Sequence, residues 1–234
     1  MRMKKKAGFW NKQYKKPTHL ALSSEPSEDL VKFAKWLVRE EGRKTLNVTA
    51  LAADMGCGNG RNLIYLSQAY GIHGVGYDTS REAIMQARAR TAAEELPLVF
   101  EERSIAKPIP LEDGKASLVL DMMSSHVLIS SEREALRDEI IRILRPGGWL
   151  FFKTFLLEED QHAKRLLKES PGPEEGMYIH PEIGVPEYVW TMEEIEIFYG
   201  QFFTIHKTEK SHKHMRADGG AWKRRTVNAY LQKI

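Results

Sequence analysis

Residues 49–62 have the sequence TALAADMGCGNGRN, on which the interpretation of the whole chain depends. An apolar run long enough for a buried strand ends at Asp54, and three glycines then alternate with other residues. A helical pattern of apolar residues begins directly after them. Glycines let the backbone turn sharply and approach a ligand closely, because they have no Cβ. A strand, a glycine turn and a helix in this order predict the first unit of a nucleotide-binding α/β fold.

The spacing of the glycines distinguishes two classes of ligand. Dinucleotide-binding enzymes carry G-x-G-x-x-G and place a pyrophosphate at the helix N-terminus. Here the pattern is G-x-G-x-G, and Asp54 lies two residues before the first glycine. A pyrophosphate beside Asp54 would be repelled, whereas a ligand with an ammonium or sulfonium group would be attracted. An NAD-linked oxidoreductase is therefore a distant alternative.

Three motifs carry a resemblance to a known family. The glycine stretch resembles motif I of the class I S-adenosylmethionine (SAM)-dependent methyltransferases, which is an acidic residue, any residue, then G-x-G-x-G. Asp78 ends an expected second strand, where this family places the carboxylate that binds the ribose hydroxyls. The sequence LRPGG at 144–148 precedes an apolar strand, as it does in this family. The similarity extends over about residues 48 to 155 and implies SAM as the cofactor.

The resemblance also implies which residues surround the cofactor. The glycine loop would hold the methionine part of SAM, Asp78 the ribose, and Ser104 with Ile105 the adenine. The family usually has an acidic residue at the position of Ser104, and this chain does not. The need for a small side chain in the loop is sufficient to explain the presence of a cysteine at position 57. The expected cofactor-binding residues are Trp10, Tyr14, Asp54, Gly56, Cys57, Gly58, Asn59, Gly60, Asn62, Asp78, Thr79, Ser104, Ile105, Asp121 and Met122.

Two histidines are the candidate catalytic residues. Methyl transfer is a direct displacement on carbon, so a base is required only when the nucleophile arrives protonated. His126 follows the expected fourth strand, beside the methyl-transfer end that Asp121 and Met122 should line, and is the first candidate. His180 in the long loop between Pro171 and Pro186 is the second. Either histidine can instead bind substrate or serve the structure.

The chain is expected to be one domain, residues 1–234, with a doubly wound, Rossmann-like α/β fold. We expect about seven strands, mostly parallel, with one antiparallel strand in a C-terminal hairpin. Helices are predicted over roughly 28–41, 131–144 and 158–169 from apolar residues at helical spacing. The expected parts are an aromatic and basic lid segment (1–26), a SAM-binding core (27–155), a substrate-side insertion (156–190), and a C-terminal helix and hairpin (191–234).

Trp10 and Tyr14 belong to an N-terminal segment that is too aromatic for a disordered tail. In small-molecule methyltransferases of this family, similar segments fold over the cofactor as a lid. Simple packing of these two side chains against the helix at 28–41 is the alternative, and the sequence leaves both open.

Composition limits the location of the protein. No apolar run approaches the ~20 residues of a membrane span, and the basic start Met1–Lys6 is followed by no apolar segment of a signal peptide. With Cys57 as the only cysteine, no internal disulfide is possible. A cytoplasmic protein without membrane association is the expectation, and the sequence does not indicate an oligomeric state.

Charge is distributed unevenly along the chain. Residues 1–17 contain seven Lys and Arg and no acidic residue, and residues 206–234 contain eight against two acidic residues. Basic ends on an acidic body suggest an anionic partner, although solvated terminal lysines explain them equally well. Residues 222–225, Trp-Lys-Arg-Arg, resemble a phosphate-binding surface. No metal site is predicted, because His206, His212 and His214 lack a cysteine or carboxylate frame.

The sequence favours a small-molecule, anionic acceptor. Methyltransferases of this fold that act on nucleic-acid amino groups usually carry Asn/Asp-Pro-Pro-aromatic after the fourth strand, where this chain has DMMS at 121–124. Cytosine-C5 enzymes need a cysteine near strand four or five, and Cys57 is not there. Methylation of RNA or of a translation-related protein is the second reading, supported by the basic ends. A non-catalytic SAM-binding module is the third.

Overall fold

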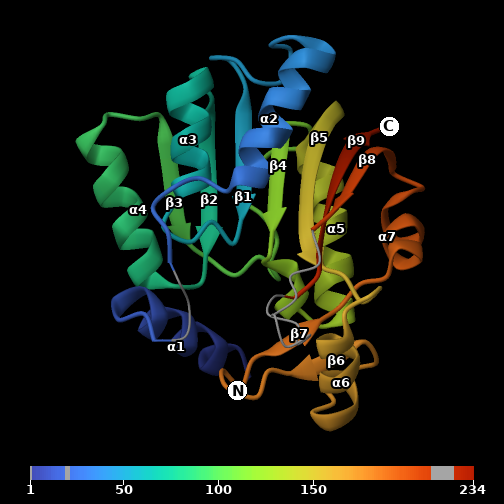
Figure 1. Ribbon diagram of the computed structural model, residues 1–234. Coiled ribbons are helices and arrows are strands. Elements are labelled where there is room, and N and C mark those ends of the chain that lie inside the picture. Colours follow the sequence, from blue (N-terminus) through green and yellow to red (C-terminus); the bar gives the residue numbers. More distant parts are fainter. Residues whose placement is uncertain (1, 19–21, 212–223) are drawn as a thin grey trace, which may run out of the picture.

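The computed structural model describes residues 2–18, 22–211 and 224–234, which form a central sheet covered by helices (Figure 1). The sheet has seven strands in the order β3-β2-β1-β4-β5-β9-β8. Strand β9 runs antiparallel to β5 and β8, and the other pairings are parallel. The predicted fold class is therefore confirmed. The strands are β1 (Leu51–Met55), β2 (His73–Asp78), β3 (Leu98–Glu102), β4 (Ala116–Met122), β5 (Leu144–Phe155), β8 (Phe203–Lys210) and β9 (Thr226–Lys233).

Helices cover both faces of this sheet. Side chains of α2, α3 and α4 share one buried apolar cluster, and side chains of α5 and α7 share another on the opposite face. A doubly wound sheet buried on both faces is typical of parallel α/β proteins. The helices are α1 (Arg2–Lys15), α2 (Glu28–Glu41), α3 (Arg61–Tyr70), α4 (Arg81–Ala93), α5 (Ser130–Ile143), α6 (Gln161–Glu169) and α7 (Met192–Tyr199), with a short 3₁₀ turn η1 (Ser125–Val127).

Strand β5 illustrates how the two apolar clusters are built. Successive side chains of a strand point to opposite faces, so Phe151 joins the α2 side while Phe152 joins the α5 and α7 side. Phe151 stacks on Phe33 of α2 with ring centroids 4.7 Å apart. Phe152 lies against Tyr199 of α7 at 5.2 Å. The continuous apolar sequence of β5 thus serves two cores.

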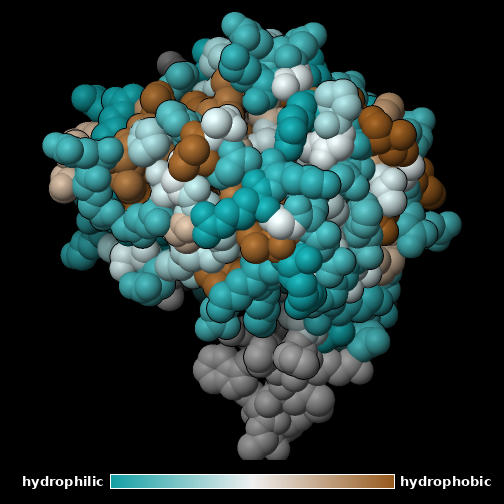
Figure 2. Space-filling model, turned by 90° about the horizontal axis from the view of Figure 1, so that it is seen from above, coloured by the Kyte–Doolittle hydropathy of each residue, from teal (hydrophilic) through white to brown (hydrophobic). Residues whose placement is uncertain are grey.

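Two elements were not foreseen from the sequence. The N-terminal segment forms the helix α1, and the insertion contains a small separate hairpin of β6 (Met177–Ile179) and β7 (Pro186–Tyr188). Both lie beyond the carboxyl ends of the parallel strands (Figure 1). The opposite end of the molecule, seen in Figure 2, is mostly hydrophilic, with apolar residues in small separate groups. Among the described residues, no helix is long and apolar enough to cross a membrane.

Phe33 is the side chain whose loss should damage the fold most clearly. It is completely buried and contacts Phe151, Tyr230 and Trp149. We expect Phe33→Ala to lower the free energy of unfolding by about 3–5 kcal/mol, the usual cost of truncating a buried aromatic, as measured by urea denaturation. Ile197→Ala is the control, because Ile197 is 70% exposed, and it should change stability by less than about 0.5 kcal/mol. Equal effects of the two substitutions would contradict this description of the core.

Candidate functional site

The glycine loop connects the end of β1 to α3 and is tied to the end of β2. Gly56 and Gly58 have φ angles of 80° and 54°, which favour glycine. The backbone N–H groups of Gly56 and Cys57 both donate to the carbonyl of Tyr77, at 2.8 and 3.0 Å. The N–H of Gly58 donates to Oδ2 of Asp78 at 2.9 Å. The carboxylate predicted to bind a ribose therefore also orders the loop.

Gly60 serves packing rather than the cavity. It is the N-cap of α3, with a φ of 75°. A Cβ at this position would lie 2.7 Å from Cζ of Phe100 and 3.0 Å from Cβ of Ala87. The third glycine is thus required by close contact of the loop with β3 and α4. It was predicted to bind cofactor, but it is not among the described residues that line the cavity.

Helix α1 lies over the glycine loop. A Cβ at Gly58 would lie 2.2 Å from the hydroxyl oxygen of Tyr14, so this ring occupies the space directly above the loop. Oδ1 of Asn11 accepts hydrogen bonds from the Ser80 hydroxyl at 2.9 Å and the Glu82 N–H at 3.1 Å, at the start of α4. Gln86 donates to the carbonyl of Tyr14 at 2.9 Å. These contacts place α1 where a lid was predicted.

The loop and α1 enclose a cavity of about 240 Å³ at the carboxyl ends of the strands. Open α/β sheets bind their ligands at this edge. Twelve of the predicted cofactor residues line it: Trp10, Tyr14, Gly56, Cys57, Gly58, Asn59, Asn62, Asp78, Thr79, Ser104, Ile105 and Met122. The structure adds Arg61, Arg103, Met123, Ser124, Val127, Leu128 and Glu132.

The sequence contained a pattern from which most of these additional lining residues could have been predicted. All but Arg61 follow the ends of β3 and β4 or begin α5, and these segments meet at the same edge of a parallel sheet. Met123 has a φ of 59°, which is uncommon for a residue with a side chain. This conformation lets the turn after β4 reach the cavity.

Asp54 lies buried beneath the loop, at 2% exposure. Its Oδ2 has no hydrogen-bond partner in the described part of the chain. Burial, together with the neighbouring carboxylates of Asp78 and Asp121, raises the pKa of Asp54 to about 8. A buried carboxyl group without a partner is costly, and a cation brought close to it would lower that cost.

Asp121 is also buried and Asp78 is partly buried, and loss of solvent raises the pKa of each carboxyl group. Oδ1 of Asp121 accepts from the Ser124 hydroxyl at 2.7 Å and the Ser125 N–H at 3.1 Å. Asp121 thereby shapes the turn after β4 from below. It was predicted to contact cofactor but is not one of the described cavity-lining residues.

His126 and His180, the predicted catalytic residues, lie outside the lining of the cavity described here. His126 is buried in η1, with Nε2 4.0 Å from Oε1 of Glu187 and its ring edge-on to Phe155 at 5.0 Å. The 3₁₀ turn directs this ring toward β7. His180 is partly exposed on the turn between β6 and β7, where its Nδ1 accepts from the Glu182 N–H at 3.3 Å.

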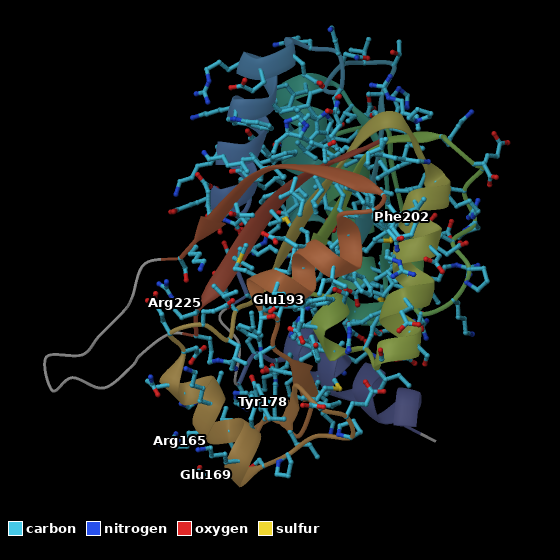
Figure 3. The ribbon with its side chains drawn as sticks, turned by 90° about the vertical axis from the view of Figure 1, so that its right-hand side faces the viewer. Arg165, Glu169, Tyr178, Glu193, Phe202 and Arg225 are labelled. Atoms are coloured by element: carbon cyan, nitrogen blue, oxygen red, sulfur yellow. The ribbon has the colours of Figure 1, made fainter. Side chains whose placement is uncertain are left out.

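Arg224 and Arg225 connect the insertion to the start of β9, where Figure 3 shows Arg225. Nε of Arg224 lies 2.9 Å from Oδ2 of Asp160, and its Nη1 lies 3.6 Å from Oε2 of Glu187 and donates to the Tyr178 hydroxyl. The N–H of Arg225 donates to the same Asp160 oxygen at 3.0 Å. Arg224 is partly buried in its ion pairs, and the buried Arg225 lies 3.7 Å from Oε2 of Glu159. These two arginines are therefore not free to form the phosphate-binding surface that residues 222–225 suggested.

His206, also singled out in the sequence, is not one of the described residues that line the cavity. His206 contacts Gln232 through Nε2 at 2.9 Å, at the edge of the sheet. Positions 212, 214, 222 and 223 lie outside the described residues. Within the described part of the chain, no three His, Cys, Asp or Glu side chains are grouped as metal ligands.

Comparison with known proteins agrees with this geometry. Residues 52–148 match the model of a methyltransferase domain family. An uncharacterized 37.1 kDa protein of a Streptomyces fradiae transposon is 40% identical over 102 residues, which are 42% of this chain and 28% of that protein. A tRNA (carboxymethyluridine(34)-5-O)-methyltransferase of Macaca fascicularis is 28% identical over 123 residues, 52% of this chain and 17% of the relative. The chain thus spans less than a third of the length of these relatives.

A crystal structure of a SAM-dependent methyltransferase from Methanosarcina mazei has the same fold. It matches with a TM-score of 0.67 at 21% identity, over 82% of this chain and 96% of that protein. Residues 52–148 therefore match a methyltransferase domain, and the described residues have the Rossmann-like fold of this SAM-dependent methyltransferase. Both findings agree with SAM as the cofactor that the motifs predict.

The contact between Gly58 and Tyr14 can be tested by a double-mutant cycle. Gly58→Ala adds a methyl group that meets the Tyr14 hydroxyl and strains a positive φ. We expect it to weaken S-adenosylhomocysteine binding by about tenfold or more, measured by calorimetric titration. In a Tyr14→Ala background the same substitution should cost less, because the clash is removed. Additive effects would contradict the placement of Tyr14 over the loop.

Proposed function

We propose that this protein transfers a methyl group from SAM to a small anionic acceptor. The observation that carries the proposal is the buried Asp54 carboxyl group, whose Oδ2 lacks a hydrogen-bond partner within the described structure, directly beneath a glycine loop that lines a cavity. SAM carries an ammonium group in its methionine part. An ammonium near Asp54 would supply the charge that this carboxyl group lacks.

The residues of the cavity fit the remaining parts of the cofactor. Asp78 already accepts two backbone N–H groups, from Gly58 and Ser80, and each of its oxygens retains a lone pair for a ribose hydroxyl. The apolar side chains of Ile105 and Leu128 line the same cavity and suit an adenine ring. When bound, SAM supplies an electrophilic methyl group on a positively charged sulfur.

The protein contributes positioning and exclusion of water. Trp10 and Tyr14 close the cavity from above, and Met122 lines it at the end of β4, where its sulfur accepts from the Asn62 amide at 3.5 Å. Holding two reactants at near-attack distance can supply several kcal/mol without an acid or base. Because His126 points toward Glu187, we propose an acceptor that arrives deprotonated, such as a carboxylate or thiolate, and needs no general base.

RNA is the second candidate acceptor. A partial relative of this chain is named a tRNA methyltransferase, and the N-terminal segment is basic. The enclosure of the cavity by α1 favours the small acceptor, because a nucleotide within a long chain must enter an active site while the chain stays outside.

Methyl transfer can be measured directly. The protein is incubated with methyl-labelled SAM and, separately, with an anionic metabolite fraction or bulk RNA. We expect label in low-mass anions and little in RNA. Asp78→Asn should weaken cofactor binding by about tenfold or more, because hydrogen bonds to a charged acceptor are lost, and should reduce the transfer accordingly. Label in RNA alone would support the second candidate, and tight SAM binding without transfer to either would contradict an enzymatic role.

The pairing of Asp54 with an ammonium group predicts a pH dependence. The pKa of Asp54 is about 8, so its carboxyl group is protonated at lower pH, and the ionised form that attracts the ammonium becomes more abundant as the pH rises. Affinity for S-adenosylhomocysteine should therefore increase about tenfold per pH unit between pH 6 and 7.5, as measured by calorimetric titration. Asp54→Asn has no proton to lose there, and its affinity should be nearly constant. If the affinities of the wild-type protein and of Asp54→Asn changed with pH in the same way, the pairing of Asp54 with the ammonium group would be contradicted.

A further inference from the structure

Helix α1 forms a wall between two hollows. Trp10 and Tyr14, four residues apart, lie on one face of the helix and line the cofactor cavity. Phe9, Lys12 and Gln13, at spacings of three and four from Phe9, lie on another face and line a second hollow together with Lys16, which directly follows the helix. Residues three and four apart are neighbours on a helix surface, so each set forms a continuous stripe. The helix that covers the cofactor cavity therefore also borders a separate groove.

This groove has a volume of about 400 Å³ and lies between α1 and the turn that joins β6 to β7. Its far wall consists of Glu182 and Ile183. The turn is closed by two backbone hydrogen bonds, from His180 N–H to Val185 O at 2.9 Å and from Gly184 N–H to His180 O at 2.8 Å. The wall opposite α1 is thus a closed turn of fixed shape.

The base of the groove is also fixed. The Gln13 side chain is 3% exposed. Its amide nitrogen donates to the Thr18 hydroxyl at 3.0 Å, and its oxygen accepts from the Thr18 N–H at 3.1 Å. This pair folds the chain back after the end of α1. Both residues line the groove, so its floor is polar and held in place.

The charge of the groove is positive. Lys12, Lys15 and Lys16 line it and are exposed, and no ion pair joins any of them to another residue in the described ranges. Glu182 is the one carboxylate among the described lining residues. In contrast, the guanidinium group of Arg224 already forms ion pairs with Asp160 and Glu187. Three ammonium groups against one carboxylate favour a ligand with more than one negative charge.

We propose that this groove binds a small molecule that carries a phosphate group. The phosphate dianion is bound by Lys12, Lys15 and Lys16, each of which offers three donors. The apolar body of this ligand packs against Phe9 and Ile183. Because α1 separates the groove from the cofactor cavity, the ligand is bound apart from the site of methyl transfer, and the inference does not rest on the proposed function.

The volume of the groove favours a small ligand over a polymer. The groove volume falls within the range of small-molecule pockets, about 300–1,000 Å³. Proteins that bind single-stranded nucleic acid instead provide a positively charged track for several nucleotides, with aromatic side chains on which bases stack. The groove offers one such ring, Phe9, among its described lining residues. A single phosphate on a compact body is the better fit.

The test uses phenyl phosphate as the probe and the full chain. Binding is followed by NMR titration of backbone amides, with and without S-adenosylhomocysteine. We expect the largest shifts in α1 and residues 180–185, and affinity at least about fivefold higher than for benzoate, which has a single charge. Lys12→Gln/Lys16→Gln should weaken the binding by about fivefold or more. The control Lys164→Gln/Lys168→Gln removes the same charge from exposed positions of α6 and should change it less than twofold.

Each result decides the proposal. Shifts confined to other surfaces, equal affinity for benzoate, or equal loss in the two double variants would overturn the phosphate subsite. An oligoribonucleotide that binds the groove more than tenfold tighter than phenyl phosphate would replace it with an RNA site. If phenyl phosphate behaves as expected while S-adenosylhomocysteine does not bind, the subsite is supported and the proposed methyltransferase function fails. If S-adenosylhomocysteine binds while phenyl phosphate does not, the phosphate subsite fails and the proposed methyltransferase function is not affected.

Discussion

The hydrogen bond from the Gly58 N–H to the Asp78 carboxylate is the interaction on which the site depends. It joins the loop after β1 to the end of β2, two strands that the chain must bring together. The other oxygen of Asp78 accepts from the Ser80 N–H at 2.8 Å, and the Ser80 hydroxyl donates to Asn11 of α1. One carboxylate therefore orders the glycine loop, the start of α4 and, through Ser80, the docking of the lid helix.

Residues of the insertion hold the opposite wall of the cavity in place. Arg133, near the start of α5, donates to the Leu128 carbonyl at 2.6 Å, and its guanidinium lies 3.8 Å from the ring centroid of Tyr188 in β7. Oε2 of Glu174 accepts from the Ser130 N–H at 2.7 Å. Insertion residues thus fix the segment after β4, four of whose residues line the cavity: Met123, Ser124, Val127 and Leu128. The insertion shapes the site without itself lining it among the residues described.

Local patterns were sufficient to predict the sheet and the glycine loop, because a strand, a glycine turn and a helix are encoded by adjacent residues. Side-chain orientations and contacts that depend on residues distant in the sequence were not predictable. The position of His126 after β4 was clear from the sequence, but the turn of η1 that directs its ring toward Glu187 was not. Arg224 looked like a free cation because its partner Asp160 is 64 residues away. The packing of Gly60 against Phe100 was not predictable either, because it is visible only in three dimensions.

The shared wall formed by α1 has a thermodynamic consequence. Both hollows use the same helix, through Tyr14 on one side and Lys12 on the other. A ligand on either side that binds only when α1 is docked stabilises the docked state, and the other ligand then binds to a helix already in place. Linkage requires the two effects to be equal, so each ligand raises the affinity for the other by the same factor. Cooperativity between the two hollows would thus follow from one helix, without any rearrangement of the sheet.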